Sequence, residues 1–275
     1  MAQAFNGEAS SPPRAILWAV PRSISTAFFR AMMNNKDVKV HLEPYAKAYY
    51  FGSERLSERY PDSPIEPNST FADIKDICEQ PESDCKAVFV KDMAYYLASR
   101  LNTTEFVPAG YTHTFLIRHP RKTIRSLYKM SLDSTLTGWT YFDPSEVGFE
   151  ELCQMYDLVK DKLGQEPMVI DADDLVTDPE PILREYCART GIPYDNAMVN
   201  WDQTPPEMKL FQDWLPWFEG TLKSTSFRSP ATKKKTDEAL PFDLEACIES
   251  NMPYYNKLYE KRFTKPSTDN LDIKQ

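Results

Sequence analysis

The chain has 275 residues, of which 41% are hydrophobic and 13% aromatic, enough for a sizeable core. Its formal net charge of −9 argues against a general nucleic-acid-binding protein, because such proteins present a broad basic face. Five scattered cysteines without a CxxC pair and three scattered histidines indicate neither a disulfide framework nor a metal site.

Five short apolar runs predict buried strands at Ala15–Val20, Val38–Leu42, Ala87–Val90, Thr114–Ile117 and Met168–Ile170. Helical patterns and helix-end signals predict helices at Thr26–Asn34, Pro120–Met130, Phe149–Leu163, Pro179–Thr190 and Phe242–Phe263. Continuous apolar strands separated by helices are typical of a parallel sheet covered on both faces. We therefore expect a three-layer α/β fold with a central, mainly parallel five-stranded sheet.

We expect residues 13–264 to form a single domain, with flexible polar termini at 1–12 and 265–275. The chain shows no signal peptide and no run of about 18 apolar residues, so we expect a cytoplasmic, reduced protein without membrane segments. Three long polar stretches are predicted to be lid and substrate loops: 50–84, 131–148 and 202–241.

The first predicted strand is followed by a turn and a helix that together suit an anion. A strand–loop–helix junction directs backbone N–H groups and the helix dipole at a ligand above the helix N-terminus. Arg22 adds a fixed positive charge, and Ser23, Ser25 and Thr26 add hydroxyl donors. The loop lacks the glycines and lysine of a Walker A motif, which argues against ATP with magnesium. The alternative is an ordinary turn with a serine helix cap.

A second junction repeats this pattern after the fourth predicted strand. Arg118 lies at the strand's carboxyl end and Ser126 lies eight residues later, in the second turn of a helix. An arginine and a serine placed there can hold a phosphate. The alternative is a capped helix with a solvated arginine. Together, the two junctions suit a ligand with two separated phosphate groups.

Four segments resemble sulfotransferases, over about residues 14–230. Ala19–Thr26 (AVPRSIST) resembles their 5′-phosphosulfate loop in its PRSGST variant, and Arg118-His119-Pro120 with Ser126 resembles their 3′-phosphate motif. Asp173–Pro179 resembles the segment after their last core strand. Ser224–Phe227 resembles the serine-rich C-terminal loop of bacterial and fungal-type members.

This resemblance implies a P-loop-like fold and the donor 3′-phosphoadenosine 5′-phosphosulfate. The sulfuryl group would pass directly to a hydroxyl or amine of a small-molecule acceptor, without a metal. Arg22 would neutralise the phosphosulfate bridge, and Arg118 and Ser126 would hold the 3′-phosphate. Backbone N–H groups of four residues would hold the 5′-phosphate: Ser23, Ile24, Ser25 and Thr26.

Such a transfer needs a general base for the acceptor's proton. His41 and Glu43 are the candidates, and strand alternation predicts that they point the same way. Glu43 is favoured because it is nearer the strand's carboxyl end and precedes a proline, as in similar sulfotransferases. Lys91 resembles the family's lysine that helps hold the transferring group. The alternatives are a salt-bridged Glu43, a core His41 and an Asp92 that caps the following helix.

The sequence departs from the family pattern at three places. Ile24 replaces the usual glycine, and its branched side chain disfavours positive φ, so a reshaped loop is expected. Met93 stands where some animal members carry a base histidine, which shifts weight to Glu43. No RKG triplet is present; Arg228 with Lys233–Lys235 is either its replacement or a solvated charge run.

Aromatic residues near the predicted loops either line an acceptor pocket or belong to the core. They are Tyr45, Tyr49, Tyr50, Tyr95, Tyr96, Trp139, Trp214 and Trp217.

Two further functions stay open beside a sulfotransferase. One is the same fold with lyase, cyclase or hydrolase activity on an anionic small molecule, which Ile24 favours, and the other is a non-catalytic nucleotide-binding protein. The sequence identifies neither the acceptor nor the oligomeric state, and it leaves a homodimer open.

Overall fold

The computed structural model describes residues 11–202, 207–227 and 240–265. They contain one parallel sheet of five strands in the order β2-β3-β1-β4-β5. The expected α/β fold is therefore confirmed, and each predicted strand lies within one or a few residues of its observed bounds. These are β1 (Arg14–Ala19), β2 (Val38–Leu42), β3 (Ala87–Met93), β4 (Thr112–Ile117) and β5 (Met168–Asp171).

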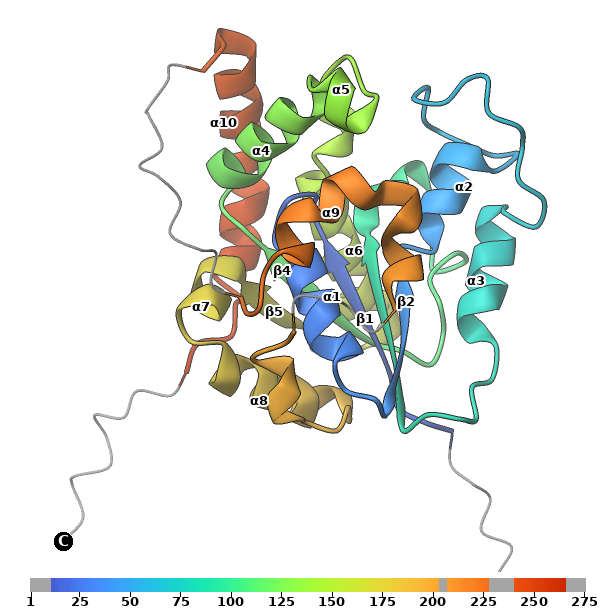
Figure 1. Ribbon diagram of the computed structural model, residues 1–275, viewed down its shortest axis with the longest axis vertical. Helices are drawn as coiled ribbons and strands as arrows, with labels where there is room; N and C mark the ends of the chain where they lie inside the picture. The colour runs from blue at the N-terminus through green and yellow to red at the C-terminus, as the bar shows by residue number, and fades with distance from the viewer. Residues whose placement is uncertain (1–10, 203–206, 228–239, 266–275) are drawn as a thin grey trace, which may run out of the picture.

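Helices cover both faces of this sheet (Figure 1). On one face, Phe28 of α1 contacts both Phe89 of β3 and Tyr186 of α8. On the other face, Phe115 of β4 contacts Tyr156 of α6. The helices that match the predicted ones are α1 (Ser25–Met33), α4 (Pro120–Ser131), α6 (Phe149–Leu163), α8 (Pro179–Thr190) and α10 (Phe242–Tyr259).

Helix α10 ends four residues before the predicted position. The chain then leaves the helix, and the backbone N–H of Phe263 donates to the carbonyl of Val169 in β5 (2.8 Å). Sheet pairing at the edge of β5 therefore replaces the last predicted helical turn, because it satisfies backbone groups that a frayed helix end would leave open.

The long stretches expected to be loops also contain helices. Helix α3 begins with a capping box, in which Thr70 and Asp73 each accept a hydrogen bond from the other's backbone N–H. This short signal was present in the sequence and was missed. The additional helices are α2 (Tyr45–Phe51), α3 (Phe71–Glu79), α5 (Ser134–Thr137), α7 (Ala172–Thr177) and α9 (Leu215–Leu222). Short 3₁₀ helices are η1 (Ala94–Tyr96), η2 (Ala98–Arg100), η3 (Pro144–Glu146), η4 (Asn196–Met198) and η5 (Met208–Trp214).

The structure also bears on the cysteines and on membrane-spanning segments. All five cysteines have free thiols. No helix in the described part of the chain is both long and apolar enough to cross a bilayer.

Candidate functional site

A cavity of about 330 Å³ lies where the loops after β1, β2, β3 and β4 meet α9. Its basic end is lined by Arg22, Ile24, Ser25, Thr26, Arg118 and Ser126. Its aromatic end is lined by Tyr50, Tyr95, Tyr96, Trp139, Trp214 and Trp217, with Glu146. Glu43 and Lys91 also line this cavity, which therefore offers a charged region beside an apolar one.

The loop of the basic end has an unusual backbone. Arg22 has φ 64° and Ile24 has φ 67°, in the left-handed region that favours glycine. The sequence predicted that Ile24 would reshape the loop. This prediction is wrong, because Ile24 adopts the left-handed backbone conformation that its branched side chain disfavours. No side chain caps the N-terminus of α1, and its first turn has no acidic residue. The free backbone N–H groups and the helix dipole there suit an anion.

The two predicted arginines meet at this end. Arg118 donates from Nη1 to the carbonyl of Arg22 (3.1 Å), and its buried Nε has no hydrogen-bond partner among the described residues. Arg22 donates from Nε to Oγ of Ser126 (3.0 Å) and from Nη1 to the carbonyl of Trp217 in α9 (2.8 Å). The two loops therefore share one cleft, as the sequence predicted.

The charges of these two arginines are only partly compensated by the described residues. Burial lowers the pKa of Arg22 to about 10, and the charge of Arg118 adds to this effect. Burial also lowers the pKa of Arg118, although the charges of Asp173 and Asp171 act in the opposite direction. Within the described residues, neither guanidinium forms a salt bridge with a carboxylate. A partly buried cation without a salt bridge is costly, so this arrangement favours binding of an anionic ligand.

The hydroxyl-bearing residues of the first loop differ in their access to the cavity. Ser25 and Thr26 line the cavity. Ser23 is fully buried, and its hydroxyl donates to the carbonyl of Val20 (2.7 Å). The expectation that Ser23 offers a hydroxyl to the ligand is therefore wrong, because that hydroxyl stabilises the turn itself.

Glu43 is held by two side chains at the middle of the cavity. Its Oε1 forms an ion pair with the ammonium of Lys91, and its Oε2 accepts a hydrogen bond from the Tyr96 hydroxyl (2.8 Å). Its backbone N–H donates to the carbonyl of Lys91 (2.7 Å) and its φ is 49°. The Lys91 side chain is fully buried, whereas Glu43 is 10% exposed. A carboxylate so fixed and still accessible can accept a proton.

His41 lies elsewhere. Its Nε2 contacts the carboxylate of Glu82 (3.4 Å), and it does not line the cavity. Burial lowers the pKa of His41, although the charge of Glu82 acts in the opposite direction. The expectation that His41 and Glu43 point the same way is wrong because β2 ends at Leu42, so strand alternation does not extend to Glu43.

Asp92 also has a structural role, but for a different helix from the one expected. Its Oδ2 accepts from the backbone N–H of Tyr45 (3.0 Å), at the start of α2, and its Oδ1 accepts from Met93 N–H (2.8 Å). Burial raises the pKa of Asp92 well above its usual range. It therefore caps α2 from the neighbouring β3.

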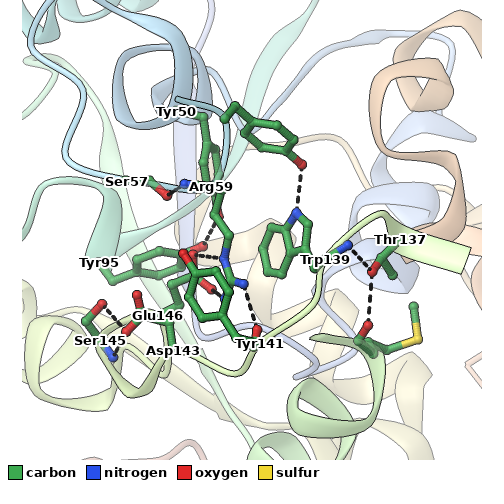
Figure 2. A network of polar contacts seen from close by, with 12 residues as sticks. Tyr50, Ser57, Arg59, Tyr95, Thr137, Trp139, Tyr141, Asp143, Ser145 and Glu146 are labelled. Carbon is green, nitrogen blue, oxygen red and sulfur yellow. Dashed lines mark hydrogen bonds and ion pairs between the residues drawn. The ribbon is translucent and has the colours of Figure 1, made fainter. Parts of the chain in front are cut away.

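The aromatic end is held by a polar network that the sequence did not reveal. Figure 2 shows Arg59 reaching between the rings of Trp139 and Tyr141 toward Glu146. Arg59 donates to both carboxylate oxygens of Glu146 (3.0 and 2.6 Å), and the two side chains are 2% and 1% exposed. The Trp139 indole donates to the Tyr60 hydroxyl (2.8 Å). No local signal predicts this pair, because its members are 87 positions apart.

The remaining candidates separate clearly. Tyr45 and Tyr49 are buried in the core and do not line the cavity, whereas the other six predicted aromatic residues do. The segment Ser224–Phe227 contributes to the cavity wall. Asp173 and Asp174 instead form ion pairs, with Lys122 and Arg262 respectively. Arg228 and Lys233–Lys235 lie outside the described residues.

The chemistry of the cavity is that of an anion site beside a carboxylate. Its described residues hold no group of three or more histidine, cysteine, aspartate or glutamate side chains arranged for a metal ion. Two partly buried arginines and the uncapped helix N-terminus can bind phosphate groups. Glu43 can accept a proton from a molecule that binds against the aromatic end.

Comparison with known proteins identifies relatives of this chain. A family model described as "Sulfotransferase domain" matches residues 13–262. Two Arabidopsis thaliana proteins, named branched-chain-amino-acid aminotransferase-like proteins 2 and 1, are 31% identical over 245 and 250 residues. Each comparison covers 88% of this chain but only 40% of the relative. Because most of each relative has no counterpart here, its name carries no conclusion about this chain.

Two solved structures have a similar fold. One is titled "Sulfotransferase Domain from the Curacin Biosynthetic Pathway", with TM-score 0.51, 18% identity, and coverage of 88% of this chain and 96% of that one. The other is a sulfotransferase from Alicyclobacillus acidocaldarius, with TM-score 0.52, 13% identity, and coverage of 92% and 97%. At such low identities these likenesses concern the fold alone.

Proposed function

Because this chain belongs to the sulfotransferase family, we propose that it transfers a sulfuryl group from 3′-phosphoadenosine 5′-phosphosulfate to a hydroxyl or amine of a small molecule. The donor's two phosphate groups would occupy the basic end of the cavity. The acceptor would lie against the aromatic end, with its nucleophilic atom beside Glu43.

One observation carries this proposal: Arg22 and Arg118, from two adjacent βα junctions, meet in one cavity, and neither forms a salt bridge with a carboxylate of the described residues. A nucleotide with separated phosphate groups supplies the missing negative charge at both. Arg118 and Ser126 would hold the 3′-phosphate, and the N-terminus of α1 would hold the 5′-phosphate. Arg22 would stabilise the charge that develops on the leaving phosphate.

The proposed transfer needs positioning and charge stabilisation more than covalent help from the protein. The acceptor oxygen or nitrogen forms a bond to sulfur while the bond between sulfur and the phosphate oxygen breaks. Glu43 takes the acceptor's proton, and the electron pair of the broken bond stays on the nucleotide product. Lys91, which lines the same cavity, supplies positive charge beside the transferring group. These steps use no metal ion.

The alternative of lyase, cyclase or hydrolase chemistry rested on Ile24. Ile24 keeps the left-handed backbone conformation that a glycine would adopt. A branched residue at this position therefore does not by itself argue for different chemistry, and no other observation favours that alternative.

Calorimetry with 3′-phosphoadenosine 5′-phosphate tests the donor site, and we expect micromolar binding. Transfer of ³⁵S from labelled donor to a panel of alcohols, phenols and amines tests the reaction. Glu43→Gln is expected to lower turnover about 100-fold, within the usual range for a lost base, while nucleotide affinity stays the same. Absence of nucleotide binding would contradict the proposal. Binding without turnover on any acceptor would instead indicate a nucleotide-binding protein.

We further propose a cytoplasmic location. The five free thiols support it, since a reducing compartment preserves them. Fluorescent tagging and cell fractionation measure it directly, and recovery in an oxidising compartment would contradict it. A homodimer remains a proposal that light scattering can test.

A further inference from the structure

Two consecutive tyrosines in η1 have different partners. The Tyr96 hydroxyl donates to Oε2 of Glu43 (2.8 Å), whereas the Tyr95 hydroxyl shares a hydrogen bond with that of Tyr50 (3.0 Å). Both tyrosines are buried, and their ring centroids are 4.5 Å apart. The chain therefore offers two nearly identical phenols, of which one contacts the candidate base.

Two side-chain donors, Lys91 and Tyr96, hold the carboxylate of Glu43 in place. Lys91 binds one oxygen and Tyr96 binds the other, so the plane of the carboxylate is fixed by these two donors. A carboxylate oxygen can accept two hydrogen bonds, which leaves lone pairs for an incoming proton. Loss of the phenol would free Oε2 and let the carboxylate rotate about its remaining contact with Lys91.

The ionisation of the surrounding groups supports this arrangement. Burial raises the pKa of Tyr96 well above its usual range, and the charge of Glu43 adds to this effect. The phenol therefore keeps its proton and donates a hydrogen bond to the Glu43 carboxylate. The other titratable groups around this pair are Lys91 and Asp92 from β3, Tyr95 from η1, and Tyr49 and Tyr50 from α2.

We propose that Tyr96 is a positioning residue for the base: its hydroxyl holds the Glu43 carboxylate in one orientation toward the acceptor. The inference rests on the proposed function, in which Glu43 takes the acceptor's proton. Tyr96 acts through Glu43 and is not required for nucleotide binding.

Tyr96→Phe removes this one hydroxyl. A hydrogen bond to a charged group is worth enough to change turnover by about 10-fold, and its loss makes the carboxylate easier to protonate. We expect turnover to fall about 10-fold and the acidic limb of the turnover–pH profile to move up by about one pH unit. Nucleotide affinity should stay the same.

Two controls separate this effect from the removal of any buried phenol. Tyr95→Phe deletes the neighbouring hydroxyl and is expected to leave the acidic limb in place, whatever its effect on acceptor KM. Tyr111→Phe deletes a buried hydroxyl that donates to the carbonyl of Cys78 (2.6 Å), away from the cavity, and should leave turnover as it is. In the Glu43→Gln background, Tyr96→Phe should cost little more, because the two residues act together.

Infrared difference spectra between wild type and Glu43→Gln identify the Glu43 carboxyl band without any turnover. Tyr96→Phe should move the pH at which this band appears upward, and Tyr95→Phe should not. If Tyr96→Phe fails to fold, the same wild-type difference spectrum must still show a changed tyrosine C–O stretch. Its absence overturns the inference.

The outcomes also distinguish this inference from the proposed function. If wild type transfers sulfuryl groups but Tyr96→Phe behaves like Tyr95→Phe, the positioning role is wrong and the function stands. If the infrared band moves but no acceptor is sulfated, Tyr96 positions Glu43 and the proposed function is wrong.

Discussion

The basic and aromatic ends of the cavity handle buried charge in opposite ways. At the basic end, the guanidinium groups of Arg22 and Arg118 have no carboxylate partner among the described residues. At the aromatic end, Arg59 and Glu146 form a buried, doubly hydrogen-bonded pair (Figure 2). We therefore expect the two arginines of the basic end to bind a ligand, and the Arg59–Glu146 pair to stabilise the fold.

The largest effect is expected from Arg59→Ala, which breaks the compensated pair. It leaves the Glu146 carboxylate buried without a partner, so the free energy of unfolding should fall by about 3–5 kcal/mol. Affinity for 3′-phosphoadenosine 5′-phosphate should stay the same. Urea unfolding and calorimetry measure the two quantities. Arg184→Ala, which removes an exposed partner of Glu180, is the control and should cost about 0.5 kcal/mol or less.

The same variant has an expected pH dependence. Burial raises the pKa of Glu146, and Arg59 counteracts this rise. An acid with a raised folded-state pKa binds more protons when folded, so stability falls as pH increases through that range. Without Arg59 the pKa of Glu146 rises further, so the pH range over which stability falls extends upward. The loss of unfolding free energy caused by Arg59→Ala should therefore be smaller at pH 5 than at pH 8. Equal costs at both pH values would contradict the assignment of this pair.

Arg118→Ala is expected to have the opposite pattern, with affinity lost and stability kept. Removal of one partner from a buried charge contact should weaken nucleotide binding about 100-fold. The free energy of unfolding should stay the same or increase, because the variant no longer holds a partly buried cation that lacks a salt bridge among the described residues. Arg121→Ala is the matched control: this exposed neighbour pairs with Glu245. If Arg118→Ala and Arg121→Ala weakened nucleotide binding to the same degree, Arg118 would have no special role in binding, and the contrast between the basic and aromatic ends would be wrong.

The smallest effect concerns the backbone of the basic end. Ile24 is strained in the left-handed region, and glycine relieves this strain whereas alanine does not. Glycine lacks only the Cβ methyl that alanine keeps, so the two variants lose nearly the same side-chain packing. Ile24→Gly should therefore be about 1 kcal/mol more stable than Ile24→Ala in urea unfolding, the reverse of the usual order at a helix. An alanine variant of equal or greater stability would show that Ile24 is not strained.

Local patterns in the sequence identified most of the fold. Apolar runs located the strands, and helix α8 was placed correctly at both ends, with Gly191 as the signal for its C-terminus. The helices that were missed, such as α3, depend on short capping signals or on packing against other elements. The prediction that Glu43 and His41 point the same way was wrong, because β2 ends at Leu42, one residue before Glu43.

The sequence by itself determined the parallel sheet, the two βα junctions with Arg22 and Arg118, and the resemblance to sulfotransferases. These features arise from residues within a few positions of one another, where periodicity, turns and helix ends act. Only the tertiary structure decided that Arg59 meets Glu146 and that Tyr96 meets Glu43, across 87 and 53 positions. Such pairs form because folding buries charged and polar groups that must then find partners, and no local pattern specifies which partners lie near.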